Sequence, residues 1–76
     1  MLIHISFQYG RLLHIEVQPM DTVKDLKKYI NSSLEYSLKH MDLIYRGKIL
    51  ENDEMLSHYS IHEDSTVHIL PLGVGN

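Results

Sequence analysis

The chain has 76 residues, no cysteine and a formal net charge of −3 at pH 7. This length suits one domain with a single core, but not the deep cleft of a typical enzyme. The lack of cysteine excludes disulfides, thiolate catalysis and Cys-ligated zinc. The seven Lys and Arg residues are scattered, so the sequence carries no electrostatic footprint for nucleic acid.

Membrane and export signals are also missing from the sequence. No apolar run approaches the roughly 20 residues that a membrane span needs. Residues 1–7 lack the basic head and the small-residue cleavage site of a signal peptide. We therefore expect a monomer in the cytoplasm and/or the nucleus, with no membrane partner and no nucleic-acid partner.

Two stretches near the N-terminus alternate between apolar and polar residues, a pattern typical of half-buried strands. They cover residues 1–7 and 12–17, and Gly10 between them is typical of a bulged hairpin turn. Pro19 has no backbone N–H to donate, so the second strand ends before it. The residues expected to face inward are Met1, Ile3, Ile5, Phe7, Leu13, Ile15 and Val17.

A helix is predicted after Thr22, which is a typical N-cap residue. Asp25 follows three positions later and supplies the acidic half of a capping box. Residues 31–33 have weak helix propensity, so the helix should fray by Leu34. Apolar residues recur at spacings of three and four and form one stripe, namely Val23, Leu26, Ile30 and Leu34.

The second half contains three further strands. Residues 41–45 and 48–50 flank Arg46-Gly47, a pair that predicts a two-residue hairpin turn in which the arginine adopts positive φ at some cost. The last strand covers residues 66–70 and should stop at Pro71. The inward residues expected in this half are Leu56, Tyr59, Ile61, Val67 and Ile69.

A helix with one apolar stripe and a sheet with one apolar face bury each other. The order of elements therefore predicts an α+β fold, with one mixed sheet of four to five strands packed on a single helix. We expect the domain to cover residues 1–70, and residues 71–76 to be a tail or the start of a linker.

Several motifs resemble ubiquitin, and the resemblance covers the full length without a gap. They include Leu-Ser-x-Tyr-x-Ile at residues 56–61, Ser-Thr-Val-His at residues 65–68 and Leu-Ile-Tyr at residues 43–45. The stretch around Gly47 also resembles the ubiquitin-like domains of ubiquilin-type shuttle proteins. The resemblance implies the β-grasp fold, which agrees with the predicted order of elements.

Alternation along the strands turns Ile44, His68 and Leu70 away from the core. Single exposed apolar residues are normal on monomers, but a patch more often marks an interface. The resemblance implies that these residues adjoin in the sheet and bind ubiquitin receptors, such as ubiquitin-interacting helices or proteasome subunits. The expected partner-binding residues are Ile44, Gly47, Lys48, Ile49, His68 and Leu70.

Two departures from ubiquitin adjoin this patch. Gln8 stands where ubiquitin has a leucine, and Asp42 stands where it has an arginine. Loss of an apolar contact and reversal of a charge imply a partner tuned to this domain. Lys48 and Lys27 match linkage lysines of ubiquitin. We nevertheless expect Lys48 to be a solvated turn residue, and the Lys27 amine to pair with a carboxylate or an amide.

The tail argues against covalent conjugation. Residues 71–76 contain no Gly-Gly pair and no preceding arginine. Adjacent glycines allow an activating enzyme to approach the backbone closely, and the branched side chain of Val74 does not. The leading hypothesis is a non-conjugated interaction module, expected at the N-terminus of a larger protein. The alternatives are a divergent covalent modifier and an engineered or viral relative of ubiquitin.

Six histidines raise the question of metal binding. His4 and His14 should lie roughly opposite each other on the first hairpin, with only Glu16 or Thr66 able to complete a site. We expect no metal, no cofactor and no enzymatic activity, because a filled small core leaves no pocket for a substrate. The same surface is a candidate secondary contact patch, made of Leu2, His4, Leu12 and His14.

Overall fold

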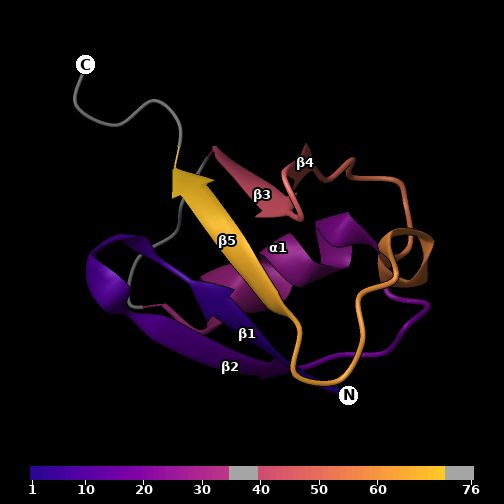
Figure 1. The fold of residues 1–76 in the computed structure, drawn as a ribbon, viewed down its shortest axis with the longest axis horizontal. Coiled ribbons are helices and arrows are strands. Elements are labelled where there is room, and N and C mark those ends of the chain that lie inside the picture. Colours follow the sequence, from indigo (N-terminus) through magenta and orange to yellow (C-terminus); the bar gives the residue numbers. More distant parts are fainter. Residues whose placement is uncertain (35–39, 72–76) are drawn as a thin grey trace.

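The computed structural model describes residues 1–34 and 40–71, which form a five-stranded mixed sheet packed on one α-helix (Figure 1). The expected α+β architecture is therefore confirmed. The strands are β1 (Leu2–Ser6), β2 (Leu12–Glu16), β3 (Met41–Tyr45), β4 (Lys48–Ile49) and β5 (Thr66–Pro71). The helix is α1 (Val23–Ser32), and two short 3₁₀ helices are η1 (Gln8–Gly10) and η2 (Leu56–Tyr59).

The strand order in the sheet is β2-β1-β5-β3-β4. Strand β5 pairs in parallel with β1 and antiparallel with β3, so the last strand lies in the middle of the sheet (Figure 1). The β1–β2 and β3–β4 pairs are antiparallel hairpins. This topology places residues that are more than 20 positions apart in the sequence side by side on one surface.

The predicted capping box at the start of α1 is present. The Thr22 hydroxyl accepts from the Asp25 backbone N–H at 3.1 Å, and the Asp25 carboxylate accepts from the Thr22 backbone N–H at 3.1 Å. These hydrogen bonds, the backbone one first, lower the pKa of Asp25 from its ordinary value of 3.8. The helix ends at Ser32, as the weak propensity of residues 31–33 predicts. The expected pairing of Lys27 is also observed, because its Nζ donates to Asn52 Oδ1 at 2.7 Å.

The core lies between α1 and the inner face of the sheet. The strand and helix residues predicted to face inward do so, although Met1, Phe7, Leu13, Leu34 and Tyr59 are only partly buried. The buried hydrophobic residues are Ile3, Ile5, Ile15, Val17, Val23, Leu26, Ile30, Met41, Leu43, Tyr45, Leu50, Leu56, Ile61, Val67 and Ile69.

Both predicted turns contain the expected positive φ angles. Gly10 has φ 80° at the end of η1, and the β3–β4 turn has φ 52° at Arg46 and φ 77° at Gly47. Two consecutive positive φ values are typical of the type I′ turn that joins two-residue hairpins. Arg46 thus accepts a left-handed backbone that glycine would adopt without strain.

Several predicted strand ends differ from the structure, since β1, β2 and β4 are each one or two residues shorter than expected. The prediction that Pro71 stops the last strand is wrong. Strand β5 includes Pro71, which lies opposite Met41 of β3. The pairing with β1 ends at Ser6 and His68. Among the strands that the structure describes, β5 pairs beyond His68 only with β3, so its other edge has no strand partner there. Pro71 is tolerated because a proline fits at a ladder position that needs no backbone N–H donor. The predicted loose loop at residues 34–40 lies largely outside the described residues, and so do residues 72–76.

Candidate interaction surface

The candidate site lies on the face of the sheet that points away from α1. Here Ile44 of β3 has two cross-strand neighbours, Ile49 of β4 and His68 of β5. His68 in turn lies beside Ser6 of β1, and Ser6 lies beside Leu12 of β2. One continuous row of side chains therefore crosses all five strands.

The apolar part of this surface, which we call the sheet patch, consists of Ile44, Ile49, His68 and Leu70. Ile49 is 60% exposed and Leu70 is 39% exposed, while Ile44 is partly buried by its neighbours. Asp42 lies directly opposite Leu70 and places a carboxylate at the border of the patch. The structure thus brings together four of the six residues expected to bind a partner.

The other two residues, Gly47 and Lys48, lie beside the sheet patch rather than within it. Gly47 belongs to the β3–β4 turn. Lys48 pairs with Tyr45, whose side chain is buried, and successive residues of a strand point to opposite faces. Lys48 therefore borders the patch at the edge strand β4 while its side chain takes the side opposite to Ile49.

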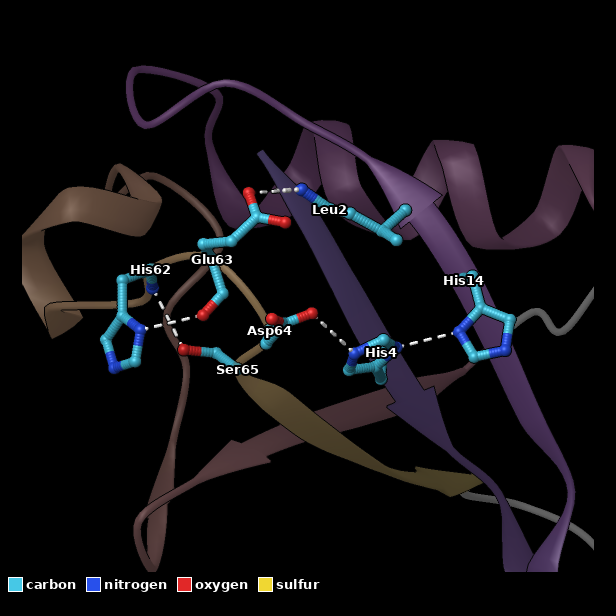
Figure 2. A network of polar contacts seen from close by, with 7 residues as sticks. All are labelled: Leu2, His4, His14, His62, Glu63, Asp64 and Ser65. Atoms are coloured by element: carbon cyan, nitrogen blue, oxygen red, sulfur yellow. Dashed lines mark hydrogen bonds and ion pairs between the residues drawn. The ribbon is translucent and has the colours of Figure 1, made fainter.

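The expected secondary patch occupies the β1–β2 half of the same face. His4 and His14 are direct cross-strand neighbours, and Leu12 is 50% exposed. The two imidazoles meet edge to face, with 2.7 Å between their Nδ1 atoms (Figure 2). Such a contact holds one shared proton, because one Nδ1 must donate and the other must accept.

The turn before β5 brings a carboxylate to the other side of His4. His4 Nε2 lies 3.2 Å from Asp64 Oδ1, so this nitrogen carries a proton that the carboxylate accepts (Figure 2). Asp64 has φ 65° and donates its backbone N–H to Leu2 O at 2.8 Å. Glu63 secures the same turn by accepting from the Leu2 backbone N–H at 3.1 Å.

Ser65 anchors this turn to the core. Its hydroxyl contacts the Tyr45 hydroxyl at 3.1 Å and accepts from the His62 backbone N–H at 2.9 Å. Ser65 is a buried polar residue, and these contacts satisfy its hydroxyl. The position of Asp64 beside His4 therefore depends on a buried hydrogen bond to β3.

Of the two residues expected to complete a site beside His4 and His14, Thr66 is the direct neighbour of His4 on β5, whereas Glu16 pairs with the Met1 amino group at 2.6 Å. The side chain that contacts His4 Nε2 is that of Asp64, which was not among the residues expected there. Within residues 1–34 and 40–71, no group of three or more His, Cys, Asp or Glu residues is arranged to hold a metal ion. No helix in these ranges is long and apolar enough to span a membrane.

A recess that sequence reasoning missed lies beside the β3–β4 turn. It has a volume of about 270 Å³ and combines the turn with residues of η2 and its C-cap. Arg46 and Lys48 are close in sequence, but nothing in the sequence places a residue ten positions later against them. The residues lining the recess are Tyr45, Arg46, Lys48, His58, Tyr59 and Ser60.

The mixed sheet with a central last strand, the single capped helix and the exposed apolar patch define a small β-grasp domain. The chain belongs to the ubiquitin family, whose family model matches residues 3–70. The expected resemblance is thus confirmed.

Individual relatives support the same assignment. The chain is 34% identical over 61 residues to ubiquitin-like protein 4A of Xenopus laevis, covering 80% of this chain and 41% of the relative. It is 34% identical over 56 residues to the ubiquitin domain-containing protein DSK2 of Saccharomyces cerevisiae, covering 74% and 15% respectively. Human ubiquitin D is 27% identical over 67 residues, covering 88% and 41%. The chain therefore spans less than half the length of these relatives.

Proposed function

We propose that this domain is a non-conjugated, non-enzymatic interaction module that binds ubiquitin receptors through the sheet patch. The observation that carries the proposal is the adjacency of Ile44, Ile49 and His68 across three strands, with Leu70 exposed beside them. Family membership supports the use of this surface for protein binding. The similarity to a relative named as a ubiquitin domain-containing protein supports a ubiquitin-related role. A place in the ubiquitin–proteasome pathway, in the cytoplasm and/or the nucleus, is part of the same proposal.

The chemistry of the sheet patch favours an amphipathic helix as the partner. Three aliphatic side chains on adjacent strands offer a shallow apolar surface on which a helix can lay its apolar face. Asp42 at the border favours a partner with a Lys or Arg near the contact, whereas a receptor selected for an arginine at this position meets the wrong charge. A surface of this size supports weak binding, with a Kd on the order of 10–500 μM.

The sequence after β5 supports the non-conjugated part of the proposal. Residues 72–76 read Leu-Gly-Val-Gly-Asn, without adjacent glycines. An activating enzyme must approach the backbone closely, which adjacent glycines allow and branched Val74 hinders. Chain linkage through Lys27 has little support as well, because its amine already donates to Asn52.

NMR titration of the labelled domain with a ubiquitin-interacting helix or a proteasomal receptor tests the proposal. Shifts should centre on the sheet patch, and Ile44→Ala should weaken binding by at least ~1 kcal/mol because it empties the centre of the patch. Met20→Ala is a matched control, since Met20 is 77% exposed and lies in the β2–α1 connection. Shifts confined to the secondary patch, with the sheet patch silent, would move the working surface to the first hairpin and refute the assignment.

A further inference from the structure

The recess beside the β3–β4 turn is cationic, although the whole chain has a net charge of −3. Arg46 and Lys48 project from the turn and from β4, and His58 projects from η2. Neither Arg46 nor Lys48 forms an ion pair with any residue in the described part of the chain, where the ion pairs involve other groups. Two permanent positive charges thus line one concave site, and neither is paired with a carboxylate of residues 1–34 or 40–71.

Aromatic contacts position two of the side chains that line the recess, Arg46 and His58. The Arg46 guanidinium lies 5.6 Å from the centroid of the Tyr45 ring, a cation–π distance. The His58 ring packs edge to face on Tyr59 at 4.9 Å, and its Nε2 lies 3.5 Å from Glu54. Tyr59 is itself fixed, because its hydroxyl accepts from the Glu51 backbone N–H at 2.8 Å. The Arg46 guanidinium and the Lys48 ammonium line the same recess, which favours a ligand with several anionic oxygens.

The recess adjoins the sheet patch through a single strand. Lys48 and Ile49 are consecutive in β4, and β4 is the edge strand of the sheet. Consecutive strand residues point to opposite faces, so Ile49 borders the patch while Lys48 lines the recess. A peptide lying on the patch and extending past the edge of β4 would bring its side chains to the recess.

We propose that the recess binds a phosphorylated side chain of the partner that occupies the sheet patch. A phosphomonoester offers about two negative charges and three acceptor oxygens, which match an arginine and a lysine better than a single carboxylate does. Phosphorylation of the partner would then strengthen its binding to this domain. The proposal rests on the proposed function for the identity of the partner surface, but the recess can be tested by itself.

The first experiment titrates the labelled 76-residue chain with N-acetyl-phosphoserine amide, followed by NMR. Shifts should concentrate on Arg46, Lys48, His58 and Ser60 and saturate with a Kd on the order of 1–10 mM. Arg46→Gln and Lys48→Gln should each weaken this binding at least about fivefold. Lys28→Gln is the matched control, because it removes one exposed charge from α1, away from the recess.

Equal losses in Arg46→Gln and Lys28→Gln, or shifts spread over all cationic residues, would overturn the proposal by showing general charge screening. Equal affinity for N-acetyl-glutamate amide would overturn the preference for phosphate, and equal affinity for inorganic phosphate would overturn a site for a side chain.

A helical peptide carrying phosphoserine should bind about tenfold tighter than its serine form, and Arg46→Gln should remove this difference. Loss of peptide binding in Ile44→Ala with phosphoserine binding retained would support both sites. Binding of the helical peptide without binding of N-acetyl-phosphoserine amide would refute only the phosphate site in the recess. Binding of N-acetyl-phosphoserine amide without binding of the helical peptide would refute only the assignment of the sheet patch as the receptor-binding surface.

Discussion

Two substitutions in the sheet and helix distinguish the core from the proposed interaction surface. Leu26 lies on α1 with no exposed area and belongs to the hydrophobic core. Leu26→Ala deletes three buried carbon atoms and leaves a cavity that the neighbouring side chains fill only in part. We expect a loss of about 3 kcal/mol, within the range of about 2–5 kcal/mol for buried Leu→Ala changes.

This loss is large for a domain of this size. At 0.05–0.15 kcal/mol per residue, the total stability is about 4–11 kcal/mol. A change of about 3 kcal/mol should lower the Tm by about 12–24 °C. Ile44 is partly exposed on the outer face, so Ile44→Ala should cost about 1 kcal/mol or less, part of it from lost strand propensity.

Thermal and urea unfolding, followed by circular dichroism, measure both variants against the parent chain. Ile49→Ala is the matched surface control, since Ile49 is 60% exposed and should change stability by less than about 0.5 kcal/mol. If Ile44→Ala lowered the Tm as much as Leu26→Ala, Ile44 would be a core residue and the sheet patch would lose its centre. The same result would remove the basis for assigning weaker receptor binding in Ile44→Ala to a lost contact.

Four further predictions concern the turn before β5, the helix cap and the tail. Tyr45→Phe removes the buried hydrogen bond to Ser65 and should cost about 1–1.5 kcal/mol in urea unfolding, whereas no loss would mean that the hydroxyl pair is not formed. Thr22→Ala should cost about 1 kcal/mol, and a smaller effect would show that the cap is replaced by water. The pKa of Asp25 is lowered in the folded state, so the contribution of its carboxylate to the free energy of unfolding is present above pH 3.8 and is lost as the pH falls through the pKa of the folded state. The difference in stability between Asp25→Asn and the parent chain should therefore shrink in acid. A difference that stayed constant with pH would contradict this linkage. Incubated with a ubiquitin-activating enzyme and ATP, the 76-residue chain should form no thioester, and a yield similar to that of ubiquitin would refute the non-conjugated assignment.

The local parts of the fold could be predicted because their signals lie within a few residues. The capping box at Thr22 depends on a spacing of three, and the turn at Arg46-Gly47 depends on two adjacent φ angles. Alternation likewise identified which strand residues face the helix. Each of these signals is read from neighbouring positions and needs no knowledge of the partner strand.

Contacts between distant segments could not be predicted in this way. Register alone placed His4 opposite His14, but the approach of Asp64 depends on the turn before β5, which Ser65 fixes to Tyr45. The cationic recess depends on the packing of η2 against the β3–β4 turn, and no periodicity encodes it. The adjacency of Ile44 and His68 followed from the resemblance to ubiquitin, not from the residues themselves.

The topology explains why a domain of this size leaves one sheet face exposed. A single helix covers one face, and the other face of a sheet in which three of the four strand pairs are antiparallel can tolerate water. On that outer face Ile44, Ile49 and Leu70 gather on β3, β4 and β5, whereas the β1–β2 half combines the exposed Leu12 with the histidine pair and its carboxylate partner. His68 lies where the halves meet, beside Ser6 on one side and Ile44 on the other. The outer apolar surface around Ile44 is therefore bordered by the Asp42 carboxylate on β3, whereas the Lys48 side chain lies on the opposite face at the edge of β4; under the proposed function, Asp42 is the charge that a partner centred on Ile44 would meet.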